Sequence, residues 1–318
     1  MTGGSSRLPL LAALFALLSP GIGPSVLAAS PEPEPAGCMG ATPDAAIANC
    51  TAALASPQGA DAHKIADMYV RRGNAYVAKA KLDQAIEDYS AAISHEGRLA
   101  GAYGGRALAY LLKGAPDQAL ADIDKAIRMD GGNAALHLEK GQILLRMNTV
   151  KSAIDEFTAS IALNSQDAEA YFLRGTSLGL QGDCRQAISD LSRSIELQPG
   201  IPTAYFNRGN CSFSMGLTDA AIADFGKAVT LQPAYKAAFN NRARAYQEKG
   251  DAKHALEDAD KAVSLPPADA VSLETRGEVH EKLAHTALAV ADYRAALQLD
   301  PQNTRAIEGL KRLDGVKP

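Results

Sequence analysis

The sequence lacks the short motifs by which most enzyme active sites are recognised. It has no glycine-rich phosphate loop, no GxSxG motif of a nucleophilic serine and no HExxH motif of a zinc protease. Its six histidines are scattered, and the closest two, His280 and His285, are five residues apart, a poor spacing for two ligands on one helical face. We therefore expect a protein that is not an enzyme and that holds no metal ion or other cofactor.

The sequence also lacks runs of lysine and arginine. Its formal net charge is −4, which becomes −5 when the one basic residue of the first 28, Arg7, is removed. Nucleic-acid binding depends on basic side chains that neutralise phosphates. A mildly acidic chain without a basic stretch therefore gives no electrostatic reason to expect a nucleic-acid partner.

Long hydrophobic runs are absent as well. The run LPLLAALFALL at 8–18 follows a single positive charge and precedes prolines, glycines and the small residues around Ala28. Spanning a bilayer takes about 20 apolar residues, so this pattern predicts a cleaved secretory signal peptide at 1–28 rather than a transmembrane helix. We expect a periplasmic or secreted protein with a Pro/Glu-rich linker at 29–41 and a folded domain at 42–318.

Cysteine is scarce, with four residues and no CxxC pair. This spacing argues against a redox-active pair and against a zinc site. In an oxidising compartment the four predict two disulfides between residues close in sequence, Cys38 with Cys50 and Cys184 with Cys211. The alternative for the second pair is two buried thiols. The alternative for Cys38 is lipidation, although the residues before it match a lipobox poorly.

A period of 34 residues runs through most of the chain. A glycine or alanine that follows a basic residue recurs seven times at this spacing without an insertion. These small residues are Gly73, Ala107, Gly141, Gly175, Gly209, Ala243 and Gly277. An alanine recurs twelve residues after each of them, and a mostly large apolar residue four positions further on. Spacings of three and four describe one face of a helix, and a fixed period of this length indicates a repeat array.

This pattern resembles the tetratricopeptide repeat (TPR) family. The pattern aromatic-x2-Leu-Gly-x2-Tyr…Ala-x3-Phe…Pro is met slot by slot over 66–303, except that arginine or lysine stands where the family has leucine. The resemblance implies an all-α superhelical solenoid of seven helix-turn-helix repeats, in which each helix pair buries its apolar face against its neighbours. An N-terminal half-repeat at 42–56 and a capping helix at 303–314 complete the expected array. Cys184 and Cys211 would then lie on neighbouring helices of repeats four and five.

A basic and an acidic slot recur sixteen residues apart in every repeat. The basic residues are Arg72, Arg106, Lys140, Arg174, Arg208, Arg242 and Arg276, and the acidic residues are Asp88, Asp122, Glu156, Asp190, Asp224, Asp258 and Asp292. Since one slot lies on the first helix and the other on the second, we interpret them as a structural salt-bridge ladder, worth about 0.2–1 kcal/mol for each exposed pair. The alternative is that the basic side chains bind a ligand.

In the TPR family the first helices line a concave groove that holds the ligand. The matching slots here predict a peptide-binding groove made of Asn74, Leu108, Leu138, Gln142, Phe172, Phe206, Asn207, Asn210, Asn240, Asn241, Arg244 and Glu278. This groove is apolar in the early repeats and acidic in repeat seven, where Glu274 and Glu281 flank Glu278.

Two groove residues, Asn207 and Asn241, share one slot in consecutive repeats and resemble the asparagine ladder of some peptide-binding TPR superhelices. An amide donates and accepts hydrogen bonds at once, so such a ladder can hold the backbone of an extended peptide. The alternative is that both are ordinary surface residues. The cations of the family's carboxylate clamp are missing from the corresponding slots, which argues against that mode.

We therefore predict a scaffold or adaptor that binds another protein or an extended peptide in the groove. Two alternatives remain open at this stage. One is a structural protein that associates with itself through its convex face or its terminal repeats. The other is a carrier of a small apolar ligand near Phe172, Phe206 and Phe213.

Overall fold

The computed structural model describes residue 38, residues 40–57 and residues 59–314. The described residues form helices and turns and contain no strand. They belong to two compact units, Met1–Gln181 and Gly182–Pro318, each with its own hydrophobic clusters. The predicted signal peptide at 1–28 and most of the linker at 29–41 lie outside the described residues.

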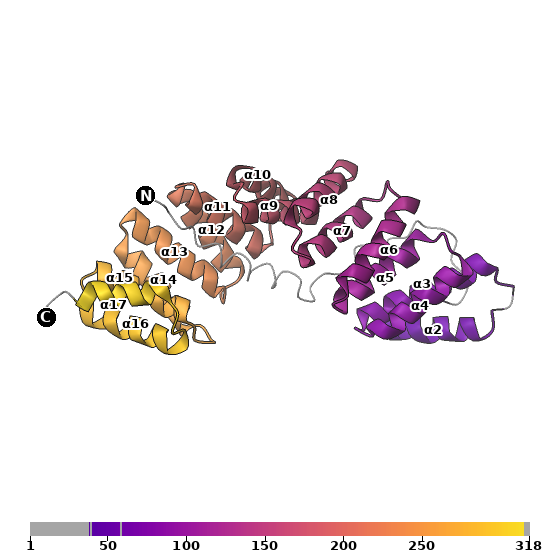
Figure 1. The fold of residues 1–318 in the computed structure, drawn as a ribbon, viewed down its shortest axis with the longest axis horizontal. Helices are drawn as coiled ribbons and strands as arrows, with labels where there is room; N and C mark the ends of the chain where they lie inside the picture. Colours follow the sequence, from indigo (N-terminus) through magenta and orange to yellow (C-terminus); the bar gives the residue numbers. More distant parts are fainter. Residues whose placement is uncertain (1–37, 39, 58, 315–318) are drawn as a thin grey trace. The chain divides into compact units, whose positions relative to one another are not determined.

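The helices of each unit follow one another as packed neighbours along the chain (Figure 1). The described part of unit 1 contains α2 (Pro43–Ala55), α3 (Ala62–Ala78), α4 (Leu82–His95), α5 (Ala100–Leu112), α6 (Pro116–Met129), α7 (Ala134–Arg146), α8 (Val150–Leu163) and α9 (Ala168–Gln181). That of unit 2 contains α10 (Cys184–Leu197), α11 (Pro202–Ser214), α12 (Thr218–Leu231), α13 (Lys236–Lys249), α14 (Ala252–Ser264), α15 (Ala270–Lys282), α16 (Thr286–Leu299) and α17 (Thr304–Asp314). The predicted all-α fold of repeated helix pairs is confirmed.

The turn between the two helices of a repeat uses one left-handed residue. It falls seven positions after the small residue in all seven repeats, with φ between 55° and 89°. These residues are Ala80, Gly114, Asn148, Gly182, Gly216, Gly250 and Ala284. Four of the seven are glycine because a Cβ atom disfavours this backbone conformation. The turn therefore helps to set the 34-residue period.

The small residue of each first helix makes room for a large residue of the second helix. A Cβ atom on Gly141 would come within 2.4 Å of the ring of Phe157, and one on Gly209 within 2.8 Å of the ring of Phe225. Both rings are fully buried. Glycine lets the two helices approach so closely that the ring fills the space between them.

The basic and acidic slots meet in the repeats whose two helices lie in one unit. In six repeats a nitrogen of the arginine or lysine lies 2.6–2.7 Å from a carboxylate oxygen sixteen residues later. In the remaining repeat, Arg174 and Asp190 belong to different units. The aspartates of these pairs are deeply buried, and Asp122 is only 3% exposed, whereas the Glu156 side chain is 18% exposed. The predicted energy of an exposed pair therefore does not apply to them.

Six of the seven basic side chains also contact a polar side chain of the second helix that precedes their own repeat, whereas for Arg242 that position is Gly226. Arg106 donates to Ser90 Oγ at 2.9 Å, and Arg208 donates to Ser192 Oγ at 3.0 Å. The same position holds Asp124 beside Lys140 and Thr158 beside Arg174. One guanidinium thus joins two successive second helices. The series ends at the last repeat, where this position is Arg294 and the next basic slot is Leu310.

Five of the arginines also lie over an aromatic ring of their own helix. The guanidinium carbon of Arg106 lies 5.6 Å from the centroid of the Tyr103 ring, three residues earlier, and Arg208 lies 5.7 Å from that of Tyr205. Stacking, ion pair and hydroxyl contact together occupy the planar group. These contacts give the arginines a structural role.

The two cysteine pairs differ in the structure. Cys38 and Cys50 form a buried disulfide that ties the segment before α2 to that helix. Cys184 and Cys211 are free thiols, so the second predicted disulfide is absent, although Cys184 is in hydrogen-bonding contact with Cys211. The pair is closer to the alternative of two free thiols, of which Cys211 is buried and Cys184 is partly exposed.

Candidate functional site

The first helices of consecutive repeats contact one another within each unit. α3 contacts α5 and α5 contacts α7 in unit 1, whereas α11, α13, α15 and α17 form a series in unit 2. We call the surface that these helices share the first-helix face. The slot three before the small residue, and those one and four after it, lie on one side of each helix. Their side chains therefore recur from repeat to repeat along this face.

The predicted groove residues of unit 1 are mostly buried. Leu108 is partly exposed, whereas Leu138 and Phe172 are buried. Gln142 is buried as well and donates from Nε2 to Glu169 Oε1 at 3.0 Å. Asn74 accepts a hydrogen bond from the Tyr89 hydroxyl at 2.7 Å. Among these predicted residues, only Leu108 and Asn74 keep part of their surface exposed.

The predicted asparagine ladder in unit 2 is largely committed to internal contacts. Asn207 is buried, and Asn241 donates to Asn210 Oδ1 at 2.7 Å. Phe206, predicted to line the groove, is 6% exposed and packs on Phe225 and Tyr235 with ring centroids 5.9 and 4.9 Å apart. The next first helix packs over these slots, which removes Phe206 and Asn207 from the surface that a ligand meets.

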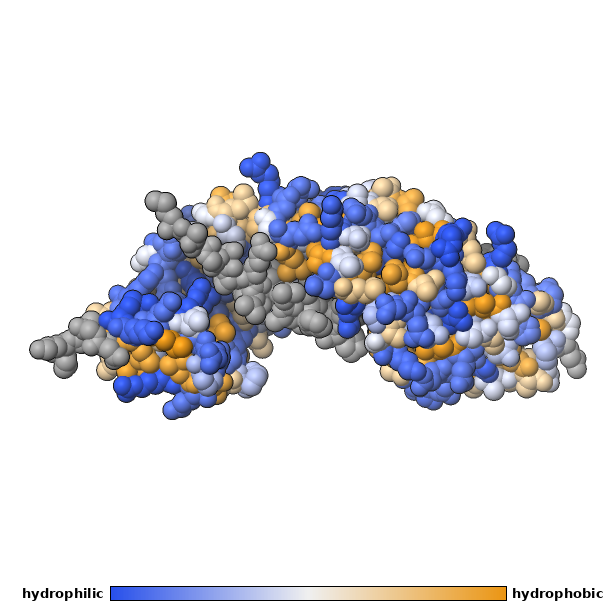
Figure 2. Space-filling model, viewed as in Figure 1, coloured by the Kyte–Doolittle hydropathy of each residue, from blue (hydrophilic) through white to orange (hydrophobic). Residues whose placement is uncertain are grey.

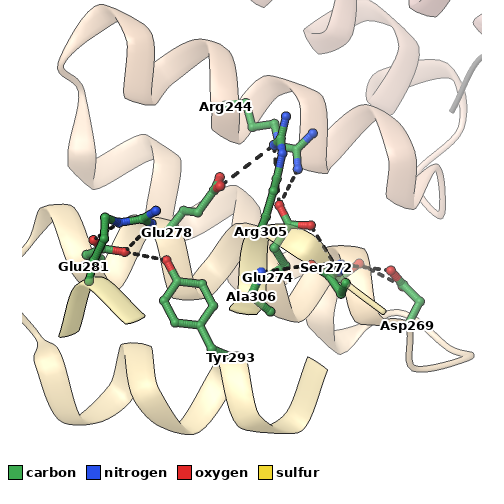
Figure 3. A network of polar contacts seen from close by, with 11 residues as sticks. Arg244, Asp269, Ser272, Glu274, Glu278, Glu281, Tyr293, Arg305 and Ala306 are labelled. Carbon is green, nitrogen blue, oxygen red and sulfur yellow. Dashed lines mark hydrogen bonds and ion pairs between the residues drawn. The ribbon is translucent and has the colours of Figure 1, made fainter. Parts of the chain in front are cut away.

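The predicted acidic end of the groove is balanced by arginines. Arg244 of α13 lies 2.7 Å from Glu274 of α15, and Arg312 of α17 lies 2.8 Å from Glu281. Arg305 lies 3.5 Å from Glu274 and 3.8 Å from Glu278. Figure 3 shows the guanidinium groups of Arg244 and Arg305 meeting beside the carboxylates of α15. The charge at this end of the groove therefore depends on arginines of α13 and α17 as well as on the glutamates of α15.

A row of buried polar atoms lies along α13. Asn240 Oδ1, Arg244 Nε and Gln247 Nε2 have no hydrogen-bond partner in the described part of the chain. Their residues are four and three positions apart, so the atoms lie on one side of the helix and span about 10 Å. Thr275 Oγ1 on α15 also lacks a hydrogen-bond partner among the described residues. Buried polar groups are nearly always paired, so this row of unpaired atoms is an exception within unit 2.

The row leads to an open pocket of about 500 Å³. Its lining residues are Gln247, Glu278, Glu281, Lys282 and Arg312, from α13, α15 and α17. Burial raises the pKa of Glu278, and the positive charges of Arg244 and Arg305 oppose this shift. Arg305 lies 3.8 Å from the Glu278 carboxylate. Donors and acceptors therefore stand side by side in this pocket, as the binding of a peptide backbone requires.

Comparison with family models decides the identity of the repeats. Models described as "Tetratricopeptide repeat" match residues 70–134, 172–236, 237–269 and 270–303. The chain belongs to the tetratricopeptide repeat family. None of the curated proteins compared with this TPR chain matches it.

Solved TPR structures resemble the chain over much of its length. YrrB, described as a TPR protein with an unusual peptide-binding site, is 26% identical, with a TM-score of 0.55 over 60% of this chain and 98% of its own. The C-terminal part of a TPR protein from Cytophaga hutchinsonii is 22% identical, with a TM-score of 0.60 over 76% and 99%. PilF from Pseudomonas aeruginosa is 21% identical, with a TM-score of 0.59 over 68% and 100%. The last two likenesses concern the fold alone.

The structure also limits other kinds of site in this TPR chain. Among residues 38, 40–57 and 59–314, no three histidine, cysteine or acidic side chains come together as metal ligands. In the same part of the chain, none of the helices is both long and apolar enough to cross a membrane. On the face visible in Figure 2, hydrophobic residues are interspersed with hydrophilic ones.

Sequence reasoning missed the most unusual residue of the first-helix face, Glu139 of α7. Its carboxyl group is buried, and neither oxygen has a hydrogen-bond partner among the described residues. A signal for it was present in the repeat alignment. Its slot, two before the small residue, holds Gly105 and Leu173 in the adjacent repeats and an acidic residue nowhere else.

Proposed function

We propose that this chain is a scaffold that binds an extended segment of another protein on the first-helix face of unit 2. TPR proteins generally act as scaffolds for proteins or peptides. The observation that carries the proposal is the row of unpartnered polar atoms on α13 that leads into the pocket. One acceptor and two donors over about 10 Å match about three residues of an extended peptide, at about 3.3 Å per residue.

Three features support a peptide as the ligand rather than a small apolar molecule. The pocket is lined by an amide, two carboxylates and two cations. The aromatic ring of Phe206, around which an apolar ligand was considered, is surrounded by the protein's own rings. The similar TPR protein YrrB is described as having a peptide-binding site.

Selection from a random 12-residue peptide library on the purified protein tests this proposal. The dissociation constants of selected peptides would be measured by fluorescence anisotropy for wild type and for Asn240→Ala/Gln247→Ala. We expect the double variant to bind about tenfold or more weakly, because it loses two hydrogen bonds to the ligand. Gln198→Ala/Gln232→Ala is the matched control, since both residues are exposed and lie outside the first helices.

Equal binding by wild type and Asn240→Ala/Gln247→Ala would place the peptide away from α13. Failure to recover any peptide with wild type, together with concentration-dependent oligomers in light scattering, would favour self-association instead. Circular dichroism of each variant shows whether the fold is retained. A loss of binding therefore counts only for a folded variant.

We also propose that the protein works in the periplasm or outside the cell. The signal-peptide pattern at 1–28 supports this location, as does the buried Cys38–Cys50 disulfide, because disulfides persist in oxidising compartments. Cell fractionation with N-terminal sequencing is the test. We expect a mature protein that begins at residue 29 in the extracytoplasmic fraction, and an intact N-terminus in the cytoplasm would contradict the proposal.

A further inference from the structure

Glu139 carries a carboxyl group that the fold of unit 1 does not use. It is 3% exposed, and both of its oxygens lack a hydrogen-bond partner within the described residues. Packing does not require an acid here, since Leu173 fills the same slot one repeat later and is also buried. An apolar residue would avoid the cost of burying an unpaired carboxyl group.

The basic side chains of the surrounding first helices are already engaged. Arg106 lies 2.6 Å from Asp122, and Lys140 lies 2.7 Å from Glu156 and 3.1 Å from Asp124. Burial alone raises the pKa of Glu139, to about 8. The carboxylate is therefore an acceptor without a partner among the described residues.

Glu139 faces a glycine of the neighbouring first helix, and this glycine is itself buried. A Cβ atom on Gly104 of α5 would lie 3.7 Å from Glu139 Oε2, so the carboxyl group points toward this backbone. Gly101, one turn earlier, has no atom within 4 Å of where its Cβ would be. The slot of Gly104 carries a side chain in the six other repeats, namely Val70, Leu138, Phe172, Phe206, Asn240 and Glu274. The remaining cover is Leu136, whose Cδ2 would lie 3.1 Å from a Cβ on Gly104.

We propose that Glu139 anchors a lysine or arginine side chain of a bound peptide, which lies across Gly101 and Gly104 on the first-helix face of unit 1. The cation enters beside Leu136 and donates to the carboxylate oxygens. This inference rests on the proposed function, since it takes a peptide as the ligand, and it adds a second place, in unit 1, where a peptide side chain is held. Charge complementarity selects the occupant, because a buried carboxylate is stabilised most by a cation that also donates hydrogen bonds.

A coupling experiment on selected peptides tests the anchor. Peptides from a random 12-residue library selected on wild type would be resynthesised with each lysine replaced by norleucine and each arginine by citrulline. Dissociation constants would be measured for wild type and for Glu139→Gln, which keeps the shape and removes the charge. Glu87→Gln is the matched control, because it makes the same change on the exposed surface of α4.

We expect one basic position to recur among the peptides, and its replacement to weaken binding to wild type by about tenfold or more. The same replacement should change binding to Glu139→Gln by less than about twofold, because the interaction is already lost. Glu87→Gln should behave as wild type does. Glu139→Leu, chosen because Leu173 fills this slot one repeat later, should fold and should lose the same preference.

Two results would overturn the inference in distinguishable ways. If peptides bind but the basic residue matters equally in wild type and Glu139→Gln, the anchor is wrong and peptide binding stands. If wild type selects no peptide at all, both the anchor and the proposed function fail.

Discussion

The ring of Tyr89 lies directly against the backbone of Gly105 in the next repeat. A Cβ atom on Gly105 would come within 2.5 Å of Tyr89 Cε1 and 2.9 Å of the hydroxyl oxygen. Tyr293 has the same relationship to Gly309, with a distance of 2.4 Å. The other five residues in the slot of these tyrosines have no ring hydroxyl, and the residue that faces them from the next repeat is larger than glycine. Each tyrosine thus has a glycine partner across the interface between repeats.

Gly105→Ala should therefore destabilise the protein by about 1–3 kcal/mol, because the added methyl group overlaps a buried ring. Gly101→Ala on the same helix should be neutral or stabilising by roughly 0.5–1 kcal/mol, because nothing lies near its Cβ and alanine favours the helix. Urea unfolding followed by circular dichroism gives both values. If the two substitutions changed the unfolding free energy in the same direction, contact with Tyr89 would not be the reason for Gly105.

The buried ion pairs predict an asymmetry between single and double substitutions. Arg208→Leu leaves the buried carboxylate of Asp224 without its partner and should cost about 3–5 kcal/mol of unfolding free energy. Arg208→Leu/Asp224→Leu removes the stranded charge as well and should be closer to wild type in stability than the single variant. Chemical denaturation of the three proteins measures the difference.

The exposed pair Lys249–Asp219 supplies the control for this experiment. Both side chains are at least half exposed, although their atoms lie 2.7 Å apart. Removing either one should change the unfolding free energy by less than about 1 kcal/mol. A single variant Arg208→Leu that was no less stable than this control would show that burial of Asp224 has little energetic effect.

The repeat period and the fold could be predicted from sequence because both depend on spacing along one chain. Glycine at 73 and tyrosine at 89 must meet whenever two helices form an antiparallel pair, and the structure brings them together. The pairing of Arg208 with Asp224 follows from the same spacing. Its second partner, Ser192, lies in the preceding repeat and could have been found two residues after the acidic slot.

The candidate site was harder to predict because burial depends on how closely the next repeat packs. Phe206 and Asn240 occupy slots that face a ligand in the family pattern, yet here the neighbouring helix covers both. The charge of the surface depended on neighbours in the same way, since Arg305 of α17 contacts the glutamates of α15. A slot pattern gives the direction of a side chain but not the distance to the helix beyond it.

The two free thiols predict the result of a mass measurement. Reduction of the intact protein should add about two mass units, from the Cys38–Cys50 disulfide alone. In the folded, unreduced protein, iodoacetamide should modify Cys184 before Cys211, because burial shields the Cys211 thiol and raises its pKa. A gain of about four mass units would instead show that Cys184 and Cys211 form a second disulfide.

Glu139 predicts how stability depends on pH. The pKa of its carboxyl group is 4.5 in the unfolded chain and about 8 when folded, so between these values the folded state binds more protons than the unfolded state. The contribution of Glu139 to the unfolding free energy therefore falls as pH rises from about 4.5 to about 8. Tyr89, which faces it, stays neutral over this range because burial raises its pKa.

Glu139→Gln removes the pH-dependent contribution of Glu139 to the unfolding free energy and leaves every other titrating group in place. We expect the unfolding free energies of wild type and Glu139→Gln to be similar near pH 5, and the variant to be more stable by a few kcal/mol near pH 8. Urea titrations across this range give the two curves, and parallel curves would mean that Glu139 is ionised and satisfied in the folded protein.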